Sequence, residues 1–198
     1  MTAEVGSPLE PGALRLATER LVLEPLGPDD VELTRVLLSD PEVTRYVMDP
    51  IDPADAPREH ARCSRRGAGG RLGIWKLTER ASGAFVGSGV LLPLPIDAED
   101  TDWPSLVEDR YPDAEIEVGY LLRPAFWGRG FATEVCRRLL QFAFEMTTLT
   151  EVVAVTDPEN VNSKRVLLKC GLRDEGERSA YATRCSAFRI SRAEWESA

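Results

Sequence analysis

Apolar and polar residues follow two different periods along the chain, and together these predict a mixed α/β protein. Between residues 115 and 122 they alternate with the period of two that is typical of a half-buried strand. That strand places Ile116, Val118, Tyr120 and Leu122 on one face. Between residues 131 and 146 the period becomes helical, and charged or polar side chains take the other face. The apolar face of this helix holds Ala132, Val135, Cys136, Leu139, Leu140, Ala143 and Met146.

Similar patterns extend over the rest of the chain. Strands are predicted over residues 16–26, 72–78, 84–92 and 152–155. Helices are predicted after Pro28, over roughly 54–66 and from residue 162. Ser82-Gly83 indicates a hairpin between two of the strands. Residues 1–13 contain Gly and Pro but few apolar side chains, so we expect a mobile leader followed by a single domain over 14–198.

A short glycine loop, Trp127-Gly128-Arg129-Gly130, joins the predicted strand to the predicted helix. Such a loop presents free backbone N–H groups and the positive end of the helix dipole, which together suit a phosphate. The loop of the nucleotide hydrolases is excluded, because Phe131 follows Gly130 where that loop needs a lysine. A dinucleotide-binding loop is excluded, because Thr133 takes the place of its third glycine.

A second strand–turn–helix block begins at residue 152. Residues 152–155 are all apolar and predict a buried strand, and Asp157-Pro158-Glu159-Asn160 predicts a turn. Asn162-Ser163 then predicts the start of a short helix. Gly171 is expected at its C′ position, where a left-handed residue commonly ends a helix.

These two blocks resemble motifs of the GNAT superfamily of acetyl-CoA-dependent N-acetyltransferases. Its loop motif is Gln/Arg-x-x-Gly-x-Gly/Ala, and Gly130 and Ala132 match the fourth and sixth positions. Trp127 at the first position is typical of the RimJ/RimL-type branch, whose loop is similar to residues 126–134 throughout. The family's second motif is matched by Asn160, Ser163, Lys169 and Gly171, although Leu172 replaces its aromatic residue.

The resemblance implies the α/β (α+β) GNAT fold, with a mixed, mostly antiparallel central sheet of six to seven strands flanked by about four helices. It implies acetyl-CoA as the co-substrate, no metal, and direct transfer of the acetyl group to the primary amine of a protein N-terminus or a small molecule. A homodimer is in keeping with it. A backbone N–H near Leu121 or Leu122, at a strand bulge, would face the thioester carbonyl. The residues then expected at the cofactor are Leu121, Leu122, Arg123, Trp127, Gly128, Arg129, Gly130, Phe131, Ala132, Thr133, Asn160 and Ser163.

Transfer to an amine needs a group that removes the ammonium proton. Glu117 lies on the strand face opposite Ile116 and Val118, at a position where the family often has a glutamate near the amine. Glu115 points the same way. The sequence therefore favours Glu117, while Glu115 and a solvated pair of carboxylates both stay open.

The departing sulfur also needs a proton donor, and the sequence identifies it less directly. Many GNAT enzymes carry a tyrosine in the late helix where this chain has Leu167. Ser163 is the nearest replacement, although the sequence favours a role for it as the N-cap of the helix. Tyr181 is a further candidate, which ordinary strand packing would also explain. A non-catalytic acyl-CoA-binding or regulatory module on the same fold is the alternative function.

Composition narrows the set of partners. A net charge of −9 over 198 residues makes nucleic acid an unlikely partner, and the arginine-rich stretch 58–71 is either an RNA contact or a solvated helix face. No apolar run reaches the length of a membrane span and residues 1–15 lack a signal peptide, so we expect a cytoplasmic protein that binds no membrane. The four cysteines contain no C-x-x-C pair, which argues against zinc, and the one histidine, His60, is expected at the surface.

Residues 93–114 form an acidic segment with seven carboxylates and a single arginine, Arg110. The segment is longer than an ordinary connection between strands. Either it overhangs the acceptor side and attracts an ammonium group, or it is a solvated surface loop.

Overall fold

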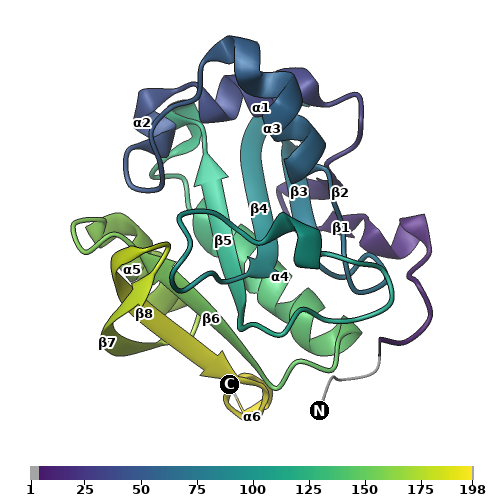
Figure 1. Ribbon diagram of the computed structural model, residues 1–198, viewed down its shortest axis with the longest axis vertical. Helices are drawn as coiled ribbons and strands as arrows, with labels where there is room; N and C mark the ends of the chain where they lie inside the picture. Colours follow the sequence, from purple (N-terminus) through teal and green to yellow (C-terminus); the bar gives the residue numbers. More distant parts are fainter. Residues whose placement is uncertain (1–4, 198) are drawn as a thin grey trace.

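A computed structural model of the chain describes residues 5–197. Within this range the chain forms one eight-stranded sheet in the order β1-β2-β3-β4-β5-β6-β8-β7 (Figure 1). Neighbouring strands are antiparallel, except that β5 and β6 run parallel. The strands are β1 (Leu16–Ala17), β2 (Leu21–Pro25), β3 (Gly73–Glu79), β4 (Phe85–Pro93), β5 (Ile116–Leu122), β6 (Glu151–Thr156), β7 (Arg173–Ala180) and β8 (Thr183–Ser191).

The mixed, mostly antiparallel sheet is as predicted, but it has eight strands in the described residues rather than six to seven. One reason is that the apolar run 16–26 forms two strands, with Leu16 opposite Leu23. The chain reverses at Thr18, whose backbone N–H donates to Leu21 O (2.9 Å) and whose Oγ1 accepts from Leu21 N (2.9 Å). A side-chain turn of this kind competes with continued pairing of the strand.

β5 and β6 are opposed at one pair of residues, Glu117 and Val153. Beyond this pair the two strands diverge toward the C-terminal end of β5 (Figure 1). On its other side β5 stays paired with β4 as far as Leu122, and the register does not shift. The bulge expected near Leu121 or Leu122 is therefore absent, and it is the divergence of β5 from β6 that opens the sheet.

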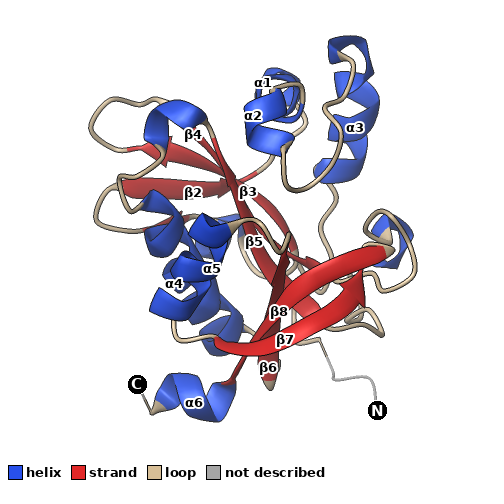
Figure 2. Ribbon diagram, turned by 90° about the vertical axis from the view of Figure 1, so that its left-hand side faces the viewer, coloured by secondary structure: helices blue, strands red, loops and turns tan. Residues whose placement is uncertain are grey.

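The described residues contain six α-helices, whereas about four were predicted. The two additional helices, α2 and α6, are little more than single turns. The helices are α1 (Val31–Leu38), α2 (Pro41–Thr44), α3 (Ala56–Cys63), α4 (Phe131–Met146), α5 (Val161–Lys169) and α6 (Arg192–Glu196). α4 and α5 lie together on one side of the sheet, and α1, α2 and α3 gather at its upper end (Figure 2). Gly171, at φ +90°, follows α5 in the left-handed conformation that was predicted for it.

The apolar face of α4 packs closely on β4. Val135 and Leu139 are fully buried, and a Cβ added to Gly89 would lie 2.8 Å from Val135 Cγ1 and 2.9 Å from Leu139 Cδ1. A side chain at residue 89 would therefore push the helix away from the sheet. Because only residues 123–130 separate β5 from α4, this packing fixes the start of the helix beside the C-terminal end of β5.

His60 is buried, with 3% of its surface exposed, and the expectation of a surface histidine was wrong. The reason is that α3 packs against α1, which turns this face of α3 inward. The ring nitrogens lie 2.8 Å from Thr34 Oγ1 and 2.8 Å from Gly27 O. Since the carbonyl can only accept, Nε2 carries the proton and Nδ1 accepts from Thr34.

The expected leader, residues 1–13, falls partly outside the described residues, which begin at residue 5. In the described part, Leu9 N donates to Gly69 O (2.9 Å) and Arg71 Nη1 donates to Ser7 O (3.1 Å). Pro11–Leu14 then forms a short 3-10 helix that leads into β1. The mobility of this leader stays a prediction.

Candidate functional site

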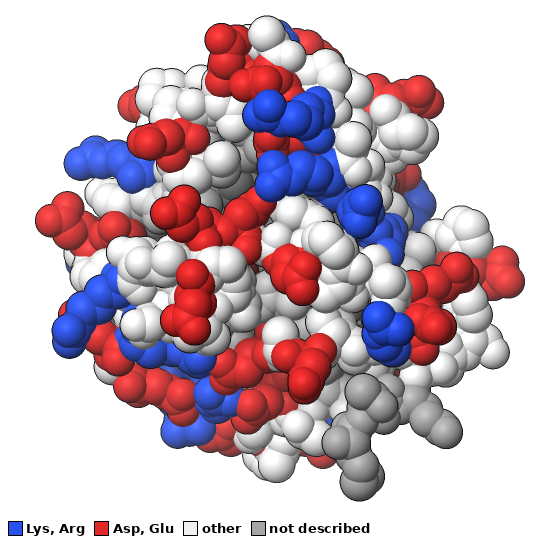
Figure 3. All heavy atoms as spheres, in the orientation of Figure 1, with Lys and Arg blue, Asp and Glu red and all other residues white. Residues whose placement is uncertain are grey.

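A cleft of about 880 Å³ lies where β5 and β6 diverge. Residues from β5, the glycine loop, the starts of α4 and α5, the α1–α2 region and the tip of the β7–β8 hairpin line it. The space-filling view shows a hollow on this face of the molecule, with carboxylates close to it (Figure 3). The cleft therefore brings together segments that are far apart in the sequence.

The glycine loop presents a continuous row of free donors. Gly128 and Gly130 both have positive φ, +71° and +82°, and α4 starts directly after Gly130. Within residues 5–197, no hydrogen bond takes up the N–H groups of residues 128–133, and the next one, Glu134 N, donates to Gly130 O. Six N–H groups without a partner in the described residues thus lie at the start of a 16-residue helix, an arrangement that suits an anionic group.

Side chains on both sides hold this loop in place. Arg129 pairs with Glu79 (2.5 Å) and lies 4.7 Å from the centre of the Phe131 ring. Arg20, from the β1–β2 turn, pairs with Glu134 (2.7 Å) and lies 4.5 Å from the centre of the same ring. The side chain of Arg129 thus contacts other protein groups. The group that this residue has free for an anion is its backbone N–H.

Trp127 and Arg123, both expected at the cofactor, have different positions. Trp127 is 49% exposed, and its Nε1 donates to Leu122 O (2.7 Å). Arg123 turns instead toward β4, where its backbone N donates to Val86 O (2.9 Å) and its Nη1 to Phe85 O (3.1 Å). Trp127 therefore borders the cleft, whereas Arg123 fastens the end of β5.

The alternation along β5 decides which of its N–H groups face the opening. Arg123 N points to β4, and along an antiparallel strand the hydrogen-bonding direction alternates from one residue to the next. The N–H of Leu121 therefore points to β4 as well, and those of Tyr120 and Leu122 point to the side where β6 has diverged. Of the two expected donors, this favours Leu122.

Glu117 and Glu115 have opposite environments. Glu117 is only 6% exposed, and burial raises its pKa to about 7, although a hydrogen bond from the Tyr181 hydroxyl acts to lower it. Partial burial also acts to raise the pKa of Glu115, but ion pairs with Arg178 (2.6 Å) and Arg189 (2.6 Å) outweigh it and lower that pKa. Only Glu117 lines the cleft.

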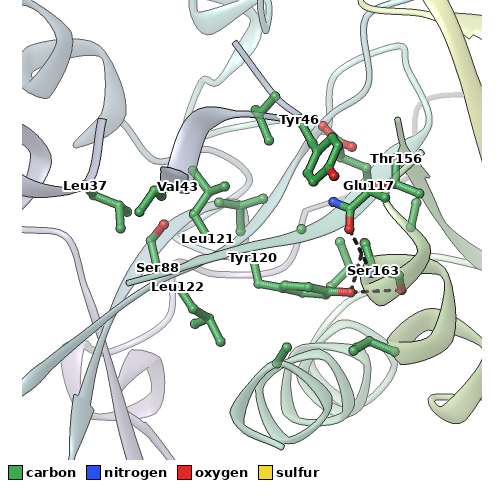
Figure 4. A pocket seen from close by; sticks show the side chains of 18 of the residues that line it. Leu37, Val43, Tyr46, Ser88, Glu117, Tyr120, Leu121, Leu122, Thr156 and Ser163 are labelled. Atoms are coloured by element: carbon green, nitrogen blue, oxygen red, sulfur yellow. Dashed lines mark hydrogen bonds between the residues drawn. The ribbon is translucent and has the colours of Figure 1, made fainter. Parts of the chain in front are cut away.

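The start of α5 presents a second polar group to the cleft. Asn160 caps the helix, since its side chain accepts from Ser163 N (3.1 Å), so the cap is Asn160 and not Ser163. The hydroxyl of Ser163 instead lies 3.2 Å from the hydroxyl of Tyr120, and Figure 4 shows the Tyr120 side chain directed from β5 toward Ser163. Leu167 is 1% exposed and packs in the core.

Sequence reasoning did not identify Tyr120 and treated Tyr181 only as a weak candidate. Tyr120 fits the apolar face of its strand, so alternation alone counts it as core. The partner of Tyr181, Glu117, is 64 residues away in the sequence. Nothing local to either tyrosine indicates these contacts, which depend on how β5, α5 and the hairpin come together.

The acidic segment partly borders the cleft. Asp100 lines it and is held by Arg62 of α3 (2.5 Å) and by Trp103 Nε1 (3.0 Å). Asp97 and Glu99 are exposed. The part of the chain described here contains no group of three or more His, Cys, Asp or Glu side chains that could hold a metal ion, and none of its helices is long and apolar enough to cross a membrane.

Comparisons with known proteins agree on one family. The model of the acetyltransferase (GNAT) domain matches residues 20–173. FsC-acetyl coenzyme A-N(2)-transacetylase of Aspergillus fumigatus is 37% identical over 162 residues, which are 79% of this chain and 64% of that protein, so the chain spans less than two thirds of this relative. The uncharacterized N-acetyltransferase p20 of Bacillus licheniformis is 29% identical over 167 residues, covering 81% of this chain and 83% of that one.

The fold is also found among solved structures. An acetyltransferase (GNAT family) from Bacillus anthracis superposes with a TM-score of 0.68 at 19% identity, covering 90% of this chain and 99% of that one. This similarity concerns the fold alone. With the family model covering most of the chain, the protein belongs to the GNAT acetyltransferase family and is an acyltransferase.

Proposed function

We propose that this protein transfers an acetyl group from acetyl-CoA directly to a primary amine. The observation that carries the proposal is the position of Glu117, a nearly buried carboxylate with a pKa near 7 that lines the same cleft as the glycine loop. A group with this pKa can both accept and release a proton near neutral pH. One cleft thus combines a candidate base with a site for an anionic donor.

The residues around the glycine loop fit the diphosphate of coenzyme A. The free N–H groups of residues 128–133 would bind the phosphate oxygens, with Trp127 at the border of the cleft and Asn160 and Ser163 at the start of α5 facing the same space. The N–H of Leu122 would donate to a carbonyl oxygen. When bound, acetyl-CoA supplies an acetyl group already activated as a thioester, so no metal is needed.

Two groups of this chain would move protons on opposite sides of the reacting carbon. Glu117 would accept the proton of the ammonium, and the free amine could then attack without a covalent enzyme intermediate. The hydroxyl of Ser163, supported by that of Tyr120, would donate a proton to the departing sulfur. Both substrates would be bound together, in a ternary complex.

The acceptor would be an amine that arrives as an ammonium ion. Four carboxylates line the cleft, those of Glu42, Asp100, Glu117 and Asp157, and carboxylates attract a cation. The 37% identity to a protein named for transacetylation at N(2) supports an amine nitrogen. The RimJ/RimL-like loop at residues 126–134 supports a protein N-terminus as an alternative to a small amine. A homodimer stays a prediction.

A turnover assay tests this function. The purified chain would be given acetyl-CoA with a panel of small primary amines and of peptides with free N-termini, and the released thiol measured. We expect turnover with at least one acceptor, and Glu117→Gln should reduce it by ~10²-fold or more while acetyl-CoA affinity is retained. Glu115→Gln is the matched control and should keep its activity. Binding of acetyl-CoA without turnover of any amine would indicate the non-catalytic module instead.

A further inference from the structure

The β7–β8 hairpin turns on two residues that seldom take this conformation. Tyr181 and Ala182 both have φ +52°, and they lie between the paired residues Ala180 and Thr183. A two-residue turn with both φ values positive favours Asn-Gly, because a Cβ is strained there. Strain of this kind persists only where the surrounding structure holds it, and it is found most often at functional sites.

The surroundings hold this turn from two sides. Tyr181 N donates to Pro95 O (3.0 Å) and Ala182 N donates to Ile96 O (3.1 Å), so both N–H groups of the turn bind the beginning of the acidic segment. From this fixed backbone the Tyr181 hydroxyl donates to Oε1 of Glu117. The strained turn thus directs one phenol onto one buried carboxylate.

The second oxygen of Glu117 remains available. Within residues 5–197, no hydrogen bond takes up Oε2, and yet this atom is not among the fully buried side-chain atoms that lack a partner. Since Glu117 lines the cleft, Oε2 is the oxygen that opens to it. The carboxylate is therefore held at one oxygen and open to an acceptor at the other.

Among residues 5–197, no cationic side chain forms an ion pair with this carboxylate. Five cationic residues line the cleft, namely Arg45, Lys76, Arg165, Lys169 and Arg184. Arg45 lies over the Tyr46 ring, Lys76 pairs with Asp30 and Arg184 pairs with Glu177. The other titratable groups that line the cleft come from α2 and the loop after it, α3, the acidic segment, β5, the loop after β6, and β8. They are Glu42 and Tyr46, Cys63, Asp100, Tyr120, Asp157 and Cys185, respectively.

We propose that Tyr181 is a positioning residue, which orients Glu117 through Oε1 so that Oε2 meets the acceptor amine. The proposal rests on the proposed function, because it gives Glu117 the role of the base. Its physical consequence follows from the hydrogen bond. A phenol that donates to a carboxylate stabilises the ionised form, so without it the pKa of Glu117 rises further above about 7. The base would then ionise at higher pH.

The test compares Tyr181→Phe with Tyr46→Phe. Both remove a hydroxyl from a tyrosine that lines the cleft, but no hydrogen bond is formed by Tyr46 within the described residues. In Tyr181→Phe the acidic limb of the kcat/KM profile should move up by about one pH unit, the scale of a hydrogen bond to a charged group. In Tyr46→Phe the limb should stay in place. A uniform loss of rate in Tyr181→Phe with an unmoved limb would overturn the proposal.

A second measurement needs neither acetyl-CoA nor an acceptor. Thermal unfolding of the free protein between pH 5 and 9 reports the ionisation of Glu117, because a carboxyl group with a raised pKa lowers stability as the pH rises toward that pKa. In Tyr181→Phe this fall should extend to higher pH than in the wild type and in Tyr46→Phe. If no amine is acetylated but the fall is displaced, the proposed function fails while the Tyr181–Glu117 contact stands. If the fall is not displaced, Tyr181 does not act on Glu117.

Discussion

The hydroxyl of Tyr120 lies 3.2 Å from the hydroxyl of Ser163, and this contact joins the middle of β5 to the first turn of α5 across the cleft. Tyr120 OH also lies 3.4 Å from the backbone oxygen of Ser163. Burial raises the pKa of Tyr120, so its phenol stays protonated at neutral pH and can donate. A hydroxyl donor thus lies in the cleft even though Leu167 takes the place of the tyrosine found in related enzymes.

We expect Ser163→Ala and Tyr120→Phe each to lower kcat by ~10-fold or more, because each removes a hydroxyl from the candidate donor pair. The double variant should be little worse than the worse single variant, since two groups that act as a unit are not additive. Steady-state kinetics with a fixed amine measure both effects. Ser88→Ala removes a hydroxyl from the same cleft without touching the pair and should leave kcat close to the wild-type value.

Acetyl-CoA should stabilise the folded protein through the glycine loop. At ~100 times its dissociation constant the expected gain is roughly 2.7 kcal/mol, seen as a higher melting temperature. Gly130→Asp should abolish the gain, because the side chain is strained at φ +82° and places a negative charge among the free N–H groups. Gly83→Asp is the matched control, since Gly83 also has a positive φ (+71°) but lies in the β3–β4 hairpin. An equal gain in both variants would mean that the loop is not the binding site.

The glycine loop could be predicted from the sequence because its signals are local. Gly128, Gly130 and the helix that starts at Phe131 lie within one short stretch, and the structure keeps them in the predicted order. The same holds for Gly171 after α5 and for the hairpin at Gly83. Each of these depends on backbone geometry over a few residues, which residue type alone largely determines.

The contacts of the candidate catalytic groups could not be predicted in this way. Tyr181 and Glu117 meet because the tip of the β7–β8 hairpin lies beside the start of β5, and the turn itself lacks the Asn or Gly that would have marked it. His60 is buried because α1 covers one face of α3, although that helix is otherwise rich in charge. Tertiary packing decides such positions, and a single sequence does not reveal which elements will meet.

Glu117 should make the stability of the free protein depend on pH. The pKa of Glu117 in the folded protein, about 7, is above the ordinary value of 4.5. The contribution of this carboxyl group to the free energy of unfolding is therefore present in full below pH 4.5 and is lost as the pH rises through 7. The loss should be about 3 kcal/mol. The glutamine in Glu117→Gln cannot ionise, so the stability of this variant relative to the wild type should increase between pH 5 and pH 8. Chemical denaturation at the two pH values measures this, and a constant difference would show that Glu117 titrates normally.

The acidic segment should attract a cationic acceptor through three exposed carboxylates, those of Asp97, Glu99 and Asp102. Asp100 is best left intact, because its contacts with Arg62 and Trp103 hold the segment in place. Changing the three exposed residues to amides should raise KM for an ammonium-bearing acceptor, leave acetyl-CoA affinity unchanged and flatten the salt dependence of kcat/KM. The reason is that the screening length falls from ~30 Å at 0.01 M salt to ~8 Å at 0.15 M, so steering by these charges is strongest at low salt.

A control of equal charge separates this local effect from the net charge of −9. Glu10, Glu145 and Glu196 are exposed and do not line the cleft, and their triple change to Gln alters the net charge by the same amount. If steering is local, the control keeps the wild-type KM and salt dependence, whereas the segment variant has a higher KM and a flatter salt dependence. If the two variants behave alike, the field of the whole protein attracts the acceptor and the segment is an ordinary solvated loop.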